Sequence, residues 1–162
     1  MASENAVIAD VPVRERAGLG WILEESFEGW YLRHSKARLR DVDLVRAAVL
    51  TGGSVGLVML KTLEPSVGYV YYIAVVRAHR KKGIAKLLLK DGLNHFKTVG
   101  VKEVFASVEK DNVPSERLFA SEGFTQTSFG KVSRKHGKFH TLNMYREMVV
   151  VPGEVLIRKT IA

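Results

Sequence analysis

The sequence contains no cysteine. This absence excludes disulfides, zinc–thiolate sites and a thiol nucleophile, and it suits a reducing compartment or a chain adapted to heat. No stretch approaches the ~20 apolar residues that a membrane-spanning helix needs. The N-terminus also lacks the basic start and apolar block of a signal peptide. We therefore expect a cytoplasmic protein without a membrane partner.

Low-complexity tracts and repeats of fixed period are also missing, which argues against a disordered or solenoid protein. With 162 residues, of which 46% are hydrophobic, the chain predicts a single domain over residues 1–162 with one core. Lys and Arg exceed Asp and Glu by 25 − 17 = 8. A surface of this charge attracts anions such as nucleotides, nucleic acid or acidic partners.

The first half of the chain predicts both strands and helices. Alternating apolar residues indicate a strand at 5–13, and a mix of aromatic and charged residues over 15–43 indicates one or two helices with a break. Residues 45–60 predict a β-hairpin closed by a Gly-Gly turn. The run 67–76 is apolar on both faces, which is typical of a buried central strand.

In the second half, apolar residues from Ala85 onward recur with helical spacing up to Phe96. A strand at 101–108 would complete a parallel β-α-β unit, and a short helix should follow around Pro114. We interpret the remaining residues as strands. They predict a hairpin with arms at 124–132 and 139–151, a basic loop between them, and an apolar tail from Pro152 that forms an edge strand or a contact in a homodimer.

A glycine-containing basic turn lies between the central strand and the periodic helix. Glycine lets the backbone turn sharply, and a helix N-terminus presents unpaired amides and a positive dipole end, which together favour a diphosphate. Lysine and arginine add positive charge. Taken alone the pattern is equally consistent with a solvated basic turn. The turn consists of Arg80, Lys81, Lys82, Gly83, Ile84 and Ala85.

Two blocks of sequence resemble the GCN5-related N-acetyltransferase (GNAT) family. The run from Ile73 to Leu88 is similar to the family's cofactor motif, an I-A-V-type strand followed by R/Q-x-x-G-x-G/A and a leucine-rich helix. The block from Asn112 to Phe124 is similar to the downstream N-x-x-A/S-x-x-L-Y/F-x-x-x-G-F pattern. The strand expected around residues 142–148 is compatible with the family as well.

This resemblance implies an α/β (α+β) fold with a mixed central sheet, flanked by helices and splayed open to hold acetyl-CoA as co-substrate. It further implies that strand backbone binds the pantetheine arm, as in strand addition to a sheet edge. The residues implied in cofactor binding are Ile73, Ala74 and Val75 for pantetheine, Arg80, Lys81, Lys82, Gly83, Ile84, Ala85 and Lys86 for phosphates, and Asn112 for pantetheine again.

The expected reaction is direct attack of a primary amine on the thioester, with a peptide, a protein or a small molecule as acceptor. It needs a proton donor for the leaving thiolate. Many family members place a tyrosine there, but this sequence has Phe119. Ser115, one helical turn earlier, and Tyr71, expected on the same strand face as Ile73 and Val75, are the catalytic candidates. Backbone capping and core packing are the structural alternatives for them.

No clear general base emerges. Glu24, Glu25, Glu109 and His140 are candidates, although surface exposure is the usual state of such residues and water could carry the proton instead. The histidines lack metal-ligand spacing with carboxylates, so we assign no metal. Two alternatives to an enzyme remain: a catalytically inactive acyl-CoA-binding protein, and a basic nucleic-acid-binding protein. The basic clusters lack the interleaved aromatic residues of a single-strand binder, which counts against the second.

Overall fold

The computed structural model describes residues 5–161. Met1–Glu4 and Ala162, which belong to the predicted domain and tail, lie outside this range. The chain forms two compact units: residues 1–61 with 70–94, and residues 62–69 with 95–162. The prediction of one domain stays a prediction. Seven strands are hydrogen-bonded in the order β1-β2-β3-β4-β5-β7-β6.

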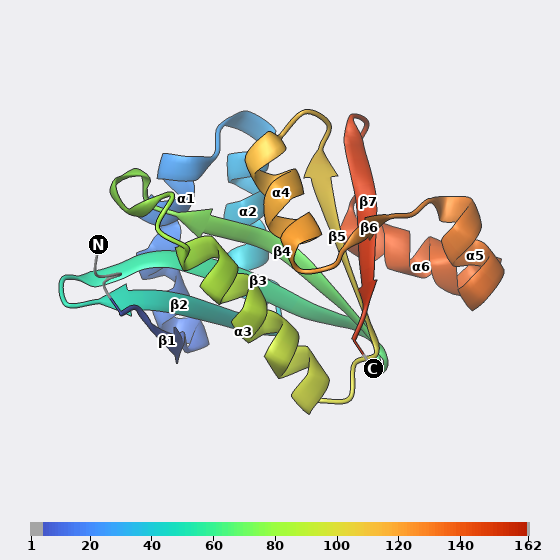
Figure 1. Ribbon diagram of the computed structural model, residues 1–162, viewed down its shortest axis with the longest axis horizontal. Coiled ribbons are helices and arrows are strands. Elements are labelled where there is room, and N and C mark those ends of the chain that lie inside the picture. The colour runs from blue at the N-terminus through green and yellow to red at the C-terminus, as the bar shows by residue number, and fades with distance from the viewer. Residues whose placement is uncertain (1–4, 162) are drawn as a thin grey trace. The chain divides into compact units, whose positions relative to one another are not determined.

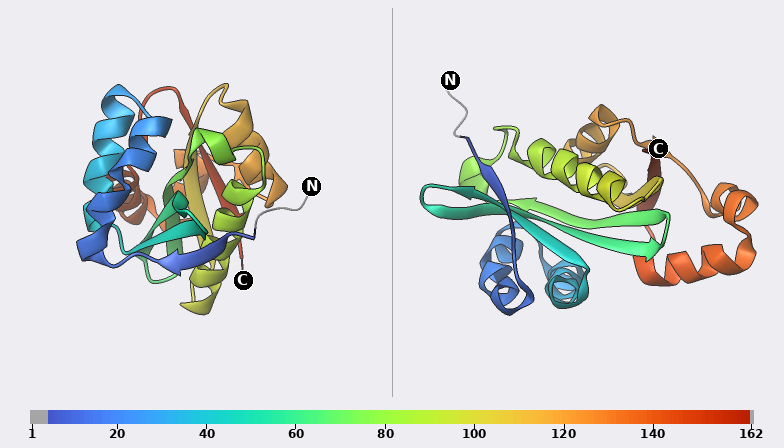
Figure 2. Two further views of the ribbon diagram at one scale, coloured as in Figure 1. Left: turned by 90° about the vertical axis from the view of Figure 1, so that its left-hand side faces the viewer. Right: turned by 90° about the horizontal axis from the view of Figure 1, so that it is seen from below.

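The first unit contains strands β1 to β4, the helices that precede the turn and most of the helix that follows it. Its elements are β1 (Val7–Asp10), η1 (Val13–Leu19), α1 (Gly20–Ser26), α2 (Gly29–Asp41), β2 (Leu44–Leu50), β3 (Gly53–Glu64, up to residue 61), β4 (Val67–Val75, from residue 70), η2 (Arg77–His79) and α3 (Ile84–Thr98, up to residue 94). Figure 2 shows α1 and α2 on one face of β2 and β3, and α3 on the other. The predicted strand, broken helices, hairpin and periodic helix are therefore confirmed.

The core of the first unit packs α3 closely against the sheet. Leu88 and Leu89 are fully buried, which is the stripe that the sequence periodicity predicts. Gly92 allows α3 to approach β3, since a Cβ there would lie 3.2 Å from the Leu60 side chain. Gly56 has the same role between β3 and β4, where a Cβ would lie 3.0 Å from the Ala74 carbonyl oxygen. Close packing thus holds β4 and α3 in place around the turn that joins them.

The second unit contains the C-terminal elements. They are β5 (Glu103–Glu109), α4 (Val113–Ser121), β6 (Thr125–Gln126), α5 (Phe129–His136), α6 (Lys138–Met148) and β7 (Glu154–Thr160), together with the start of β4 and the end of α3. The amides of Lys102 and Glu103 bond the Ser66 carbonyl, so β4 and β5 begin side by side. This is the parallel arrangement expected for a β-α-β unit, and the sheet is mixed because β5 and β7 are antiparallel. The predicted mixed α/β fold is confirmed.

The predicted C-terminal hairpin is wrong. Residues 129–136 and 138–148 form the helices α5 and α6, which pack together, and Figure 1 shows them beside each other. Ser128 caps α5 by accepting a hydrogen bond from the Lys131 amide. The buried residues Thr141, Met144 and Met148 have helical spacing, a signal that the alternating apolar and polar residues nearby obscured. The resemblance of residues 142–148 to a final family strand fails with it.

The apolar tail is a strand, but it is not an edge strand. β7 lies between β5 and β6, paired antiparallel with both, and β6 takes the edge. Leu156 and Ile157 are buried within the chain. The apolar tail therefore gives no reason to expect a homodimer.

Candidate functional site

The basic turn joins the end of β4 to α3 through a short 3₁₀ helix, η2. Lys81 and Gly83 both have left-handed backbones, with φ of 61° and 82°. A Cβ built at Gly83 would meet no atom within 4 Å, so the space beside this residue is open. The amides of the first turn of α3 have no acceptor inside the helix. The turn thus combines open space, backbone donors and the positive end of a 15-residue helix.

The cationic side chains of the turn fall into two kinds. Lys81 and Lys82 are exposed. Arg80, in contrast, braces the turn: its Nε donates to the Val75 carbonyl oxygen at 2.9 Å. Its Nη2 reaches Ser26 Oγ at 3.3 Å and the Glu25 carbonyl oxygen at 3.4 Å. Arg80 therefore holds the turn against β4 and α1, and its predicted contact with a phosphate stays a prediction.

The strand residues predicted to hold pantetheine lie directly before this turn. In β4, Tyr72 and Ile73 are half-buried, whereas the other seven residues are buried. The Val76 amide bonds the Val55 carbonyl, which ties the end of β4 to β3. This buried strand is thus partly accessible at Ile73, where the predicted pantetheine segment, residues 73–75, begins.

Asn112 and Ser115 contact each other in the second unit. Asn112 is the N-cap of α4, and its Oδ1 accepts a hydrogen bond from the Ser115 amide at 3.3 Å. Phe119 is buried and packs edge-to-face on Phe124, with ring centroids 5.0 Å apart. Asn112 thus has the structural role of a helix cap. The proposed roles of Asn112 in cofactor binding and of Ser115 in catalysis stay predictions.

Tyr71 lies near a histidine of α2, and its predicted role in catalysis stays a prediction. Its ring centroid is 6.2 Å from that of His34 on α2, and the ring of Tyr72 is 5.8 Å from the same imidazole. Val75 faces the α3 side instead, because a Cβ at Gly56 would meet both Val75 and Leu88 of α3.

His34 is a residue that sequence patterns do not select. Its Nδ1 lies 2.7 Å from the Tyr72 hydroxyl oxygen, and its ring stacks on Trp30 with centroids 4.7 Å apart. Burial and, to a smaller extent, the nearby Arg38 lower the pKa of His34, opposed in part by Asp41. His34 is therefore neutral at pH 7. A single histidine on an amphipathic helix carries no sequence signal, and only the fold brings it to β4.

Two of the acidic candidates for a general base, Glu24 and Glu25, have structural partners. Glu24 forms an ion pair with Lys36, and Glu25 Oε1 accepts a hydrogen bond from the Arg77 amide at 2.6 Å. Glu109 is exposed at the end of β5. His140 is exposed on α6, where its Nδ1 lies 2.9 Å from Glu64 Oε1, so it is not in a strand as the sequence suggested. None of these contacts identifies a base.

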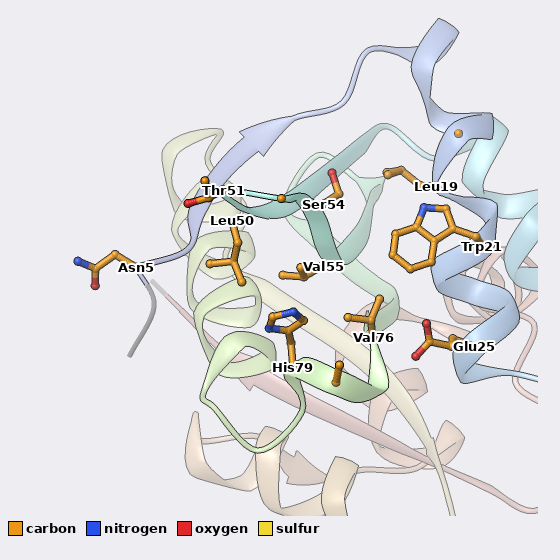
Figure 3. A pocket seen from close by; sticks show the side chains of 13 residues that line it. Asn5, Leu19, Trp21, Glu25, Leu50, Thr51, Ser54, Val55, Val76 and His79 are labelled. Carbon is orange, nitrogen blue, oxygen red and sulfur yellow. The ribbon is translucent and has the colours of Figure 1, made fainter. Parts of the chain in front are cut away.

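A pocket of about 940 Å³ opens beside the turn in the first unit (Figure 3). Trp21 and Glu25 of α1 lie on one side of it, and His79 of η2 lies opposite the hairpin turn. Its lining residues are Asn5, Gly18, Leu19, Trp21, Glu25, Leu50, Thr51, Gly52, Ser54, Val55, Val76, Ala78 and His79. The pocket thus adjoins the end of β4 on the side of β3.

Two further properties concern residues 5–161. This part of the chain contains no group of three or more His, Cys, Asp or Glu residues that could hold a metal ion. None of its helices is long and apolar enough to span a membrane.

Curated relatives are similar to less than half of the chain. A mycothiol acetyltransferase from Nocardioides sp. is 41% identical over 59 residues, which are 36% of this chain and 20% of that protein. The mycothiol acetyltransferase of Corynebacterium glutamicum (strain R) is 31% identical over 71 residues, 44% of this chain and 24% of that protein. The matches thus span about a quarter or less of these relatives.

Solved structures share the whole fold. The ribosomal-protein-S18-alanine N-acetyltransferase of Escherichia coli has a TM-score of 0.73 at 12% identity, covering 98% of this chain and 95% of the other. The PaiA N-acetyltransferase of Thermoplasma acidophilum, solved with coenzyme A, also has a TM-score of 0.73, at 14% identity and with 97% and 99% covered. The acetyltransferase (GNAT) family model matches residues 16–124, which include the turn, β4 and α4. The chain belongs to the GNAT family of acetyltransferases.

Proposed function

We propose that the protein is an N-acetyltransferase that transfers the acetyl group of acetyl-CoA to a primary amine. The observation that carries this proposal is the turn from Arg80 to Gly83, which is open in front of the helix N-terminus and follows a strand accessible at its middle. Membership in the GNAT family supports the same cosubstrate.

The residues present fit coenzyme A. The diphosphate needs donors and positive charge, which the first turn of α3, Lys81 and Lys82 provide. A side chain at Gly83 would enter the space beside these donors, and the glycine keeps it open. Pantetheine is a chain of amides, which the backbone of residues 73–75 would bind in the manner of an added strand. Lys86 and the backbone at Ile84 and Ala85 would complete the phosphate contacts, and Asn112 would contact pantetheine.

Acetyl-CoA supplies a thioester, which an unprotonated amine attacks directly. Direct transfer requires no nucleophile from the protein, so the absence of cysteine is compatible with it. The protein has to bind both substrates, orient them and move protons. Ser115 and Tyr71 are retained as candidate proton donors. A protein N-terminus, a lysine side chain or a small amine could act as the acceptor.

Calorimetric titration of the purified protein with acetyl-CoA and with CoA tests cofactor binding. We expect saturable binding, lost in Gly83→Glu, because a carboxylate would fill the phosphate space with like charge. Gly52→Glu, in an exposed turn with no atom within 4 Å of its Cβ, is the matched control and should bind normally. No binding by the wild-type protein at millimolar CoA would refute the proposal.

Release of free CoA thiol in the presence of peptides, polyamines and amino acids tests the transfer itself. Activity with any acceptor excludes a protein that binds acyl-CoA without turning it over. Binding without turnover across the panel would favour that inactive alternative. A protein that ignored CoA and bound nucleic acid with a steep salt dependence would instead be the nucleic-acid-binding alternative.

A further inference from the structure

A histidine and a tyrosine form a polar pair inside an aromatic cluster of the first unit. His34 Nδ1 and the Tyr72 hydroxyl oxygen are 2.7 Å apart. Trp30 stacks on the His34 ring with an angle of 9° between the planes. Phe27 packs edge-on against Tyr72, with centroids 5.1 Å apart. The two polar groups are thus oriented by rings from α2, β4 and the segment between α1 and α2.

The hydrogen-bonding capacity of this pair is not used up by its mutual bond. His34 Nε2 is buried and has no hydrogen-bond partner in the structure. A neutral imidazole carries a donor on one ring nitrogen and an acceptor on the other, so the bond to Tyr72 uses only one of the two nitrogens of His34. Buried polar groups are normally satisfied, and exceptions are common at sites that act on a ligand. The pair therefore has the properties of a functional site rather than those of a core bond alone.

The position of Tyr72 connects the pair with the reaction. Tyr72 and Ile73 are the two accessible residues of β4. Ile73 begins the segment that would bind pantetheine, so a ligand that reaches this segment passes beside Tyr72. His34 is half-buried behind Tyr72. Tyr72 is thus the half-buried residue directly before the segment where the thioester would arrive.

The charges around His34 come from its own helix. Arg38 disfavours the imidazolium and Asp41 favours it, while burial has the largest effect and lowers the pKa. The groups that face it from β4 are Tyr71 and Tyr72, and Trp30 is uncharged. The imidazole is consequently neutral at physiological pH and able to accept a proton.

We propose that Tyr72 is a catalytic residue that contacts the acceptor amine and that His34 acts through it as the proton acceptor of acetyl transfer. The proposal rests on the proposed function. As the amine nitrogen forms a bond with the acetyl carbon, its proton passes to the Tyr72 oxygen, and the tyrosine proton passes to His34 Nδ1. The carbon–sulfur bond then breaks, and the imidazolium returns the proton through Tyr72 to the sulfur. The products are the N-acetylated amine and CoA thiol, with both residues restored.

Two variants test the pair, each removing little volume. Tyr72→Phe deletes one oxygen, and His34→Gln keeps a polar side chain without a titratable group. Tyr145→Phe and His95→Gln are matched controls, since Tyr145 packs on Phe129 and His95 lies beside Phe96 in the second unit. We expect each test variant to lower kcat about 100-fold, which is typical for loss of acid–base catalysis. Their affinity for CoA by calorimetry and their circular dichroism should match those of the wild type.

The pH dependence separates a proton-transfer role from a packing role. In the wild type, kcat/KM should rise through an inflection below pH ~6.5, the ordinary value for histidine. His34→Gln should remove this inflection, whereas His95→Gln should keep it. A readout without turnover is the NMR titration of the His34 ring, whose pKa should lie below the ordinary value for histidine and should change in Tyr72→Phe.

The outcomes distinguish this proposal from the proposed function. If the wild type acetylates an amine and both test variants keep its kcat and pH profile, the pair has no part in catalysis and the function stands. If Tyr72→Phe is impaired while the His34 titration is unmoved, the relay through His34 is refuted. If the wild type neither binds CoA nor releases thiol, both proposals fall.

Discussion

Arg80 Nε lies 2.9 Å from the carbonyl oxygen of Val75, so a side chain of the turn closes back onto the strand that leads into it. The same guanidinium reaches Ser26 Oγ of α1. The strand β4 and the helix α1, which are far apart in sequence, therefore both bond Arg80 and hold the turn in place before α3.

Replacement of Arg80 should affect stability and binding together. Arg80→Ala removes these hydrogen bonds and is expected to lower the free energy of unfolding by about 1–2 kcal/mol, while CoA binding weakens because the turn is no longer held. Lys82→Ala should change stability by less than about 0.5 kcal/mol, with weaker CoA binding that depends less on salt. Urea denaturation and calorimetry at two salt concentrations measure both effects. Equal stability losses in the two variants would contradict the bracing role.

Gly83 is expected to resist substitution through its backbone rather than through crowding. Its φ is 82°, and a Cβ would meet no atom within 4 Å. Gly83→Ala should cost about 1 kcal/mol of stability because an L-residue is disfavoured there, and it should weaken CoA binding about tenfold, equivalent to about 1.4 kcal/mol. Gly52→Ala, which has equal space and no positive φ, is the control for thermal unfolding and titration. A Gly83→Ala variant that behaves like the control would refute the assignment.

Gly68 should tolerate no side chain while Phe96 is present. A Cβ at Gly68 would lie 2.7 Å from the Phe96 ring in the second unit. Gly68→Ala is expected to lower stability by about 1–3 kcal/mol through overpacking. Combining it with Phe96→Leu should cost less than the sum of the two single changes, because the residues share one space. Additive losses in urea denaturation would show that the predicted clash does not occur.

Glu103 should make the second unit sensitive to acid. It is 3% exposed, and Lys135, His136 and Arg158 all contact its carboxylate. Burial raises the pKa of Glu103, but the hydrogen bonds from these three residues outweigh it and leave the pKa below its usual range. At pH values between the lowered pKa of the folded protein and the usual pKa of the unfolded chain, the unfolded state therefore binds more protons than the folded state. The resulting stability is complete above about pH 4.3 and is lost as pH falls through the lowered pKa.

Glu103→Gln should lower stability at neutral pH by about 3 kcal/mol, because Lys135 and Arg158 lose their counter-charge. It should also flatten the dependence of unfolding free energy on pH in the acidic range. Glu116→Gln, at an exposed position on α4, should leave that dependence intact. If Glu103→Gln retained the acid sensitivity of the wild type, another carboxylate would be responsible.

Local pattern was sufficient for the elements around the turn. The spacing of Leu88, Leu89 and Leu93 predicts α3, and the doubly apolar run before Val75 predicts the buried strand β4. Both patterns arise from burial on a helix stripe or on two strand faces, so they are visible in a single sequence. The prediction for the C-terminal region was wrong because it relied on a local pattern as well. Alternating apolar and polar residues around Phe139 resemble a strand, although Thr141, Met144 and Met148 are buried residues of a helix.

The glycine-containing basic turn, its strand and its helix could thus be recognised from the chain alone, because the residues that form them are neighbours in sequence. Only the tertiary structure could decide what Arg80 holds, which face Tyr71 occupies and which histidine meets a tyrosine. His34 and Tyr72 are 38 positions apart, and no local periodicity relates them. Their contact exists because α2 packs beside β4, and this depends on the packing of the whole unit.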